Sequence, residues 1–167
     1  CSYIERRFSV MPELPRSKIP GLGGRYLERW QRYGSEQADE AQIAAWIVVA
    51  EPDAGNSVVA LDVDNPNAYG AVREVFGSLR PPSKVGRKGV TAFFCAKGEP
   101  IASRKFLERR NERSQQFPLV EILSAGNKTT LPPSIHPETL KPYQWRNASL
   151  EEVRRPCDLP LLTQYHV

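Results

Sequence analysis

Short apolar runs recur along the chain and predict β-strands. Each run is rich in β-branched or aromatic side chains, which favour a pleated and buried surface. The strands are expected at residues 8–11, 47–50, 58–61, 90–95, 117–123 and, as a small element, 143–145.

Apolar residues at helical spacing predict helices between these strands. The clearest helix covers residues 67–79, between the break at Asn65-Pro66 and the stop at Arg80-Pro81-Pro82. Its expected apolar face contains Ala68, Ala71, Val72, Val75, Phe76 and Leu79. Other helices are expected at residues 25–33, from a cap at Ser35 or Asp39 up to Trp46, at 149–155 and, in part, in the charged stretch 99–116.

A turn follows the strand at residues 117–123 and predicts a hairpin. The turn covers residues 124–127, and the chain would return through residues 128–131. The proline-rich segment 132–137 that follows is expected to be extended and stiff, with Ser134 and His136 on the same side.

These elements predict an α+β fold in which helices pack on one face of a sheet. The 167 residues, of which 40% are hydrophobic and 25% charged, fit a single domain over residues 1–167. No apolar run has the length of a membrane span, so no membrane partner is expected. Because the chain begins at Cys1 rather than Met, we expect it to be excised from a longer polypeptide.

The cysteines and the net charge indicate the cellular compartment and the class of partner. Cys1, Cys95 and Cys157 lie far apart and are odd in number, which argues against a zinc ribbon or a disulfide framework and fits a reducing cytoplasm. A net charge of +4 and a pI near 9.1 favour a polyanionic partner. The basic residues between positions 104 and 113 form either a nucleic-acid-binding face or, as is commoner, a solvated helix face.

Two aspartates, Asp62 and Asp64, directly follow the apolar run at residues 58–61. Alternate residues of a strand point to the same side, so both carboxylates would share one face. Burying two carboxylates is costly unless a positive group offsets them, and a divalent cation with oxygen ligands is a natural candidate. Alternatively, the strand has ended and Asp64-Asn65-Pro66 caps the next helix.

Two further features could complete a site. The segment that begins at Lys84 has two glycines and three basic residues before a β-type run, and it could bring its backbone close to a phosphate while its cations face it. The loop Gly86-Arg87-Lys88-Gly89 within it could equally be a hairpin turn with solvated charges. Glu121 interrupts an apolar strand, so it is either partly buried with a partner or at a sheet edge facing water. Asp62, Asp64 and Glu121, with Arg87, Lys88 and His136 nearby, would suit metal-dependent phosphoryl or nucleotidyl transfer.

The order of these motifs resembles that of a known superfamily. Leu61-Asp62-Val63-Asp64, then residues 86–94, then Val120-Glu121-Ile122 are similar to motifs one, two and three of the archaeo-eukaryotic primase superfamily. More narrowly, the chain resembles the bifunctional primase-polymerase (prim-pol) domains of plasmids, phages and integrated elements. Residues 132–137 with Tyr143-Gln144-Trp145, and the closing Asp158-Leu159-Pro160, agree with this resemblance.

The resemblance implies both a fold and an activity. The fold would be a catalytic sheet like that of RNA-recognition motifs (RRM-like), packed against a smaller amino-terminal α/β unit. The activity would be template-directed nucleotidyl transfer from NTPs or dNTPs with two Mg²⁺ or Mn²⁺ ions, on a single-stranded DNA template and primer. A helicase in the same or a neighbouring polypeptide would be a partner.

The resemblance also implies roles for individual residues. Asp62, Asp64 and Glu121 become catalytic metal ligands. Arg87 and Lys88 become triphosphate contacts, with Lys18 as a further candidate. Thr91 occupies the place where the second motif normally has a histidine that touches the nucleotide, and a threonine cannot carry charge. We therefore expect His136, beside Ser134, or Lys88 to supply the missing contact.

Three functions are compatible with these features. The first is an active primase-polymerase domain that replicates a plasmid, phage or integrated element. The second is a non-catalytic or weakly catalytic single-stranded-DNA-binding module of the same fold, in which Thr91 marks the loss. The third is an unrelated Asp-x-Asp metal-dependent phosphotransferase or nuclease.

Overall fold

A computed structural model describes residues 9–11, 18–19, 21–22, 25–26, 47–49, 52–53, 56–77, 79–98, 101–110, 115–124, 126–163 and 166. The main feature is a seven-stranded sheet in which six strands follow the order β12-β7-β8-β6-β10-β9. All their pairings are antiparallel. The strands are β12 (Gln144–Trp145), β7 (Ser83–Val85), β8 (Val90–Lys97), β6 (Asn56–Val63), β10 (Gln115–Leu123) and β9 (Arg104–Arg110), while β5 (Pro52–Asp53) pairs with the start of β6.

One face of this sheet packs against the helix α2 (Tyr69–Phe76), which follows the 3-10 turn η3 (Pro66–Ala68). Val59, Leu61 and Val63 of β6 point to this face, where Val72 and Phe76 of α2 pack against their cluster. Asn65 caps η3, since its side chain accepts a hydrogen bond from the Asn67 N–H at 3.0 Å. The expected helix at residues 67–79 is therefore present, in a shorter form.

The opposite face carries a second core around Val58, Ala60, Phe93 and Cys95. Leu131, Leu150 and Leu159 complete this core from the carboxyl-terminal third of the chain. The turns η4 (Leu150–Glu152) and η5 (Pro156–Asp158) replace the helix expected at residues 149–155, although Ser149 does form a capping box with Glu152.

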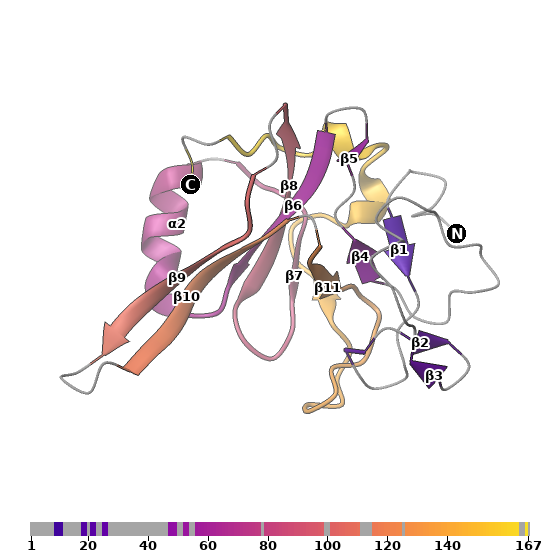
Figure 1. Ribbon diagram of the computed structural model, residues 1–167, viewed down its shortest axis with the longest axis horizontal. Helices are drawn as coiled ribbons and strands as arrows, with labels where there is room; N and C mark the ends of the chain where they lie inside the picture. Colours follow the sequence, from indigo (N-terminus) through magenta and orange to yellow (C-terminus); the bar gives the residue numbers. More distant parts are fainter. Residues whose placement is uncertain are drawn as a thin grey trace.

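Two small sheets accompany the main one. β1 (Ser9–Met11), β4 (Ile47–Val49) and β11 (Lys128–Thr130) form an antiparallel three-stranded sheet, and β2 (Gly21–Leu22) pairs with β3 (Arg25–Tyr26). The three-stranded sheet and α2 lie on opposite sides of the main sheet (Figure 1). No helix in the described part of the chain is long and apolar enough to cross a membrane.

The prediction that residues 117–123 and 128–131 form a hairpin is wrong. β11 pairs with β4 instead of β10. Both edges of β10 are already occupied, by β6 on one side and β9 on the other, so no edge remains for β11. The chain therefore leaves the main sheet at Leu123, the end of β10, and enters the smaller sheet at Lys128, the start of β11.

Two helix predictions also fail where the structure describes them. Arg104–Arg110 is the strand β9, paired along its length with β10, so the charged stretch 99–116 is not a helix there. Arg25 and Tyr26 belong to β3, and the rest of the helix expected at residues 25–33 lies outside the described residues, as does the helix expected between Ser35 and Trp46. On α2, Val75 is 49% exposed, and Leu79, which lies beyond the helix, is 43% exposed, so the buried face is narrower than predicted.

The architecture is thus a mixed α/β fold with a largely antiparallel sheet, as the α+β prediction required. Among the described residues α2 covers one face of the sheet. The RRM-like topology, the single domain over residues 1–167 and the smaller amino-terminal unit remain predictions.

Among the glycines whose surroundings the structure describes, Gly89 is predicted to be the least tolerant of substitution. It has a φ of +53°, and an added Cβ would lie 1.8 Å from the Val63 carbonyl oxygen. Gly89→Ala should therefore lower the free energy of unfolding by about 2–3 kcal/mol. Gly70→Ala on α2 is the matched control, because it meets no atom within 4 Å and should raise that free energy by about 0.5–1 kcal/mol. Urea denaturation measures both, and equal effects would contradict the prediction.

Candidate active site

A row of polar side chains crosses the main sheet on the face opposite α2. Asp62 of β6 is paired with Glu121 of β10 on one side and with Thr91 of β8 on the other. Lys105 of β9 extends the row beyond Glu121, and Lys84 of β7 extends it beyond Thr91. Directly paired residues of antiparallel strands project to the same face, with Cβ atoms about 4.5–5.5 Å apart. The register therefore brings together residues that are far apart in the sequence.

A pocket of about 600 Å³ opens over this row. It brings together most of the residues predicted from the sequence, namely Lys18, Asp62, Asp64, Arg87, Lys88, Thr91, Glu121 and His136. Ser134 does not line the pocket, and its hydroxyl is buried without a hydrogen-bond partner. The expectation that Ser134 and His136 act side by side therefore has no support in the geometry, because the segment turns at Pro132 and Pro133 rather than extending.

Asp62 is a partly buried carboxylate at the centre of the polar row. Burial raises its pKa, and the negative charges of Asp64 and Glu121 raise it further. Two contacts oppose this shift: a hydrogen bond from the Thr91 hydroxyl at 2.6 Å and the charge of Lys84. A hydroxyl has one proton to donate, so Thr91 cannot donate to a phosphate while it donates to Asp62.

Glu121 has a different partner. Its carboxylate forms an ion pair with the Lys105 ammonium of the neighbouring strand. The hydrogen bond to Glu121 and the charge of this carboxylate raise the pKa of Lys105, so the ammonium stays charged. Glu121 is thus a partly buried carboxylate with a partner, the first of the two alternatives left open by the sequence.

Lys84 and Tyr143 form the opposite wall of the pocket. Lys84 is only 6% exposed, and its ammonium lies 4.7 Å from the centre of the Tyr143 ring, within cation–π distance. Gly86 allows this ring to approach, because a Cβ at Gly86 would lie 2.5 Å from Tyr143 Cε1. The first glycine of the basic loop is therefore needed for packing against Tyr143.

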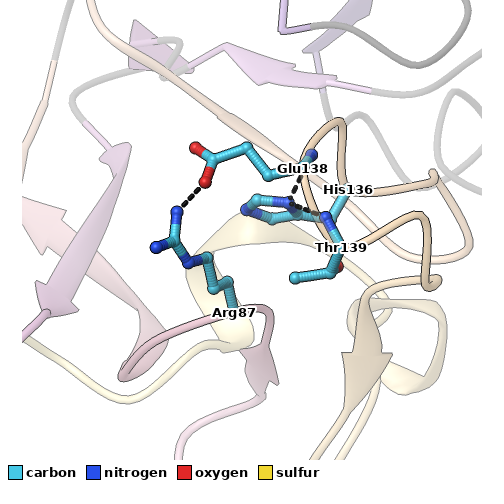
Figure 2. A network of polar contacts seen from close by, with 4 residues as sticks. All are labelled: Arg87, His136, Glu138 and Thr139. Carbon is cyan, nitrogen blue, oxygen red and sulfur yellow. Dashed lines mark hydrogen bonds and ion pairs between the residues drawn. The ribbon is translucent and has the colours of Figure 1, made fainter.

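His136 has a defined tautomer. Its Nδ1 accepts hydrogen bonds from the backbone N–H groups of Glu138 at 3.1 Å and Thr139 at 3.3 Å (Figure 2). Burial lowers its pKa, as do the charges of Lys18, Arg87 and Lys84, so the ring is neutral near pH 7. The single ring proton must then be on Nε2, which leaves that N–H as the donor for a ligand in the pocket.

Two further cations of the pocket, Arg87 and Lys128, already have contacts. Arg87 forms an ion pair with Glu138, on the same turn that holds His136 (Figure 2). The Lys128 ammonium donates to the carbonyl oxygen of Lys18, which connects β11 to the segment around residue 18. Lys88 lies on the pocket wall and is exposed.

The comparison with known families identifies the family of this chain. A model of the family "Bifunctional DNA primase/polymerase, N-terminal" (Prim-Pol) matches residues 1–162. The chain belongs to the Prim-Pol family. A search of curated proteins gives no match. The resemblance seen in the sequence is therefore confirmed, and the reading as an unrelated phosphotransferase or nuclease is wrong, since the match covers nearly the whole chain.

The chemistry of the Prim-Pol acidic cluster suits a divalent cation, but the side chains are not arranged around one. Three carboxylates lining one pocket are the oxygen donors that Mg²⁺ and Mn²⁺ prefer. The effect of Asp64 and Glu121 on the pKa of Asp62 indicates mutual repulsion that a cation would relieve. In the part of the chain that the structure describes, however, no three such side chains lie close enough to hold a metal ion.

Several pocket residues of this Prim-Pol domain were not predicted as site residues. Lys84, Lys128, Glu138 and Tyr143 line the pocket, and Lys105 reaches Glu121 from the edge strand. Lys84, two positions before the first glycine of the loop, was expected only as one of the three basic residues of the segment 84–89. No local signal identifies the partners of Glu121 or Arg87, because the contacts depend on which strands and turns are neighbours.

The raised pKa of Asp62 predicts how its charge affects stability. The folded state holds the Asp62 proton more tightly than the unfolded state, so the protonated carboxyl stabilises the folded state. This stabilisation is fully present below the pKa of Asp62 in the unfolded state and is lost as the pH rises through its pKa in the folded state. Asp62→Asn should therefore raise the free energy of unfolding at pH 7 by roughly 0.5–1 kcal/mol in metal-free buffer. Near pH 3 the gain should be small. Urea denaturation at both pH values tests this.

Asp158→Asn is the control, for which the change in the free energy of unfolding at pH 7 should have the opposite sign. Its hydrogen bond with Arg155, at 3.2 Å, is the main cause of a lowered pKa, so removing the charge should lower stability at pH 7. A loss of stability at pH 7 in Asp62→Asn would contradict the account of Asp62.

Proposed function

We propose that this Prim-Pol domain catalyses metal-dependent, template-directed nucleotidyl transfer from NTPs or dNTPs. The observation that carries the proposal is the shared pocket, in which Asp62, Asp64 and Glu121 face the cationic loop of Arg87 and Lys88. Acidic residues on a rigid sheet and cations on a neighbouring loop are the two halves that phosphoryl-transfer chemistry requires. The alternative of a non-catalytic DNA-binding module is favoured by Thr91 and by the absence, among the described residues, of an assembled metal site.

In this proposal Asp62, Asp64 and Glu121 would hold Mg²⁺ or Mn²⁺. When bound, such a cation lowers the pKa of the attacking hydroxyl and stabilises the leaving pyrophosphate. Thr91 orients the Asp62 carboxylate through the hydrogen bond of 2.6 Å. The sheet holds the backbones of Asp62 and Glu121 in register, so these side chains start from neighbouring positions.

The triphosphate would be bound by the other side of the pocket. Arg87 and Lys88 supply positive charge, and Lys18 would add a further cation at the rim. His136 supplies an oriented neutral N–H in place of the histidine that Thr91 replaces. The ion pair of Arg87 with Glu138 would have to open or rearrange for Arg87 to bind a phosphate.

The proposed partners follow from the same activity. A single-stranded DNA template and a primer would be the polymer substrates, and the net charge of +4 favours their binding. A helicase encoded in the same or a neighbouring polypeptide, and a role in replicating a plasmid, phage or integrated element, are proposed from the family resemblance. A cytoplasmic location is proposed on the same basis.

The activity can be tested by primer extension with Mg²⁺ or Mn²⁺. Asp62→Ala/Asp64→Ala should reduce the rate at least about 100-fold, because the acidic ligands would be removed. Glu74→Ala/Glu151→Ala is the matched control, since it removes two exposed carboxylates outside the pocket and should leave the rate unchanged. DNA binding by the unmodified chain without any extension would favour the non-catalytic module.

Two variants of His136 distinguish the roles of its two ring nitrogens. His136→Asn keeps an acceptor near the Nδ1 position, whereas His136→Gln keeps a donor near Nε2. If Nε2–H binds the triphosphate, His136→Asn should raise the KM for the nucleotide about 10-fold, the loss of one hydrogen bond to a charged group, with a smaller change in kcat. His136→Gln should retain more of the affinity.

Lys88→Met tests the other candidate for this contact. An unchanged KM in His136→Asn together with a raised KM in Lys88→Met would assign the contact to Lys88. Circular dichroism on each variant would show whether the overall secondary structure is retained.

A further inference from the structure

Lys105 and Glu121 form the outer end of the polar row. They are directly paired across β9 and β10, and their side chains form an ion pair. The lysine side chain is 68% exposed, whereas that of the glutamate is 19% exposed. Lys105 therefore covers the acidic cluster from the open edge of the sheet, at a position that solvent can reach.

This pair and the Thr91 hydrogen bond hold two of the three carboxylates from different strands. Asp62 is held by Thr91 on the β8 side of the row, whereas Glu121 is held by Lys105 on the β9 side. Asp62 and Glu121 are neighbours on the sheet, and their partners Thr91 and Lys105 lie on the two outer sides of this pair. In the described segments, no three metal-binding side chains are close enough to share an ion.

We propose that Lys105 is a positioning residue that holds Glu121 as an internal counter-ion and thereby weakens the affinity of the acidic site for divalent cations. This inference rests on the proposed metal site and adds a determinant of its affinity. A cation that uses Glu121 must exchange with the ammonium group or share the carboxylate with it. Full engagement of Glu121 is then coupled to release of Lys105 from the pair.

The expected size of the effect is modest. The ammonium and a divalent cation would repel each other across one carboxylate, but Lys105 is largely exposed and water screens its charge. Replacing Lys105 by methionine should therefore strengthen Mn²⁺ binding roughly 3- to 10-fold. The difference should shrink as the salt concentration rises, because mobile ions screen exposed charges.

Calorimetric titration of the metal-free 167-residue chain with Mn²⁺ tests the proposal without measuring catalysis. Lys105→Met should lower the dissociation constant, and Lys105→Arg, which keeps the charge, should remain close to the unmodified chain. Lys97→Met is the matched control. It removes the same charge from the far end of β8, outside the pocket, and should leave the dissociation constant unchanged.

A second pair of variants shows whether Lys105 acts through Glu121. In a Glu121→Gln background the ion pair is already lost, so adding Lys105→Met should change Mn²⁺ affinity less than it does alone. An equal or larger gain in Mn²⁺ affinity in that background would overturn the positioning role. Direct repulsion between Lys105 and the metal ion would then explain the effect of Lys105 without Glu121.

The outcomes distinguish this inference from the proposed function. Unchanged or weaker Mn²⁺ binding in Lys105→Met, with normal binding by the unmodified chain, overturns the role of Lys105 alone. Binding heat that persists in Asp62→Ala/Asp64→Ala would place the metal elsewhere and overturn it too. If neither the unmodified chain nor Lys105→Met binds Mn²⁺, the metal site fails together with this inference. Primer extension separately reports whether nucleotidyl transfer occurs.

Discussion

The antiparallel register of β6 between β8 and β10 is the constraint on which the site depends. It places Glu121 and Thr91 on either side of Asp62, on the sheet face opposite α2. Side chains alternate between the faces of a sheet, so a slip of one residue would turn Glu121 toward the α2 face and an apolar neighbour toward the pocket. The buried residues on both faces oppose such a slip, because it would expose apolar side chains and bury charged ones. The same packing that stabilises the sheet therefore fixes the geometry of the site.

Groups that could bind ligands are paired with one another in this pocket. Lys105 neutralises Glu121, Glu138 neutralises Arg87, and the Thr91 hydroxyl satisfies Asp62. Buried or crowded charges are costly without partners, so these internal contacts make the ligand-free pocket tolerable. Binding of a metal ion or a triphosphate at these groups would then be an exchange of partners. Affinity would depend on the internal contacts as well as on the ligand.

Thr91 and His136 make different contributions to the pocket. The hydroxyl of Thr91 donates to Asp62, which leaves no proton for a phosphate. His136 is buried against the same pocket with its Nδ1 already occupied by backbone N–H groups. The hydroxyl that holds the Asp62 carboxylate and the neutral ring of His136 thus come from different segments of this Prim-Pol domain.

The sequence by itself determined the local elements and much of the chemistry. Alternation along residues 58–64 predicted that Asp62 and Asp64 share a face, although β6 ends at Val63 and Asp64 follows the strand. The interruption at Glu121 left two alternatives, of which the carboxylate with a partner is the one found, and the helix after Asn65 followed from its spacing and cap. Only the tertiary structure decided that residues 104–110 form a strand, that β11 pairs with β4, and that Lys105 meets Glu121. Periodicity and capping act between residues a few positions apart and can be read along one segment. Strand partners and ion pairs depend on which distant edge is free to receive a segment, and that is settled only when the whole chain packs.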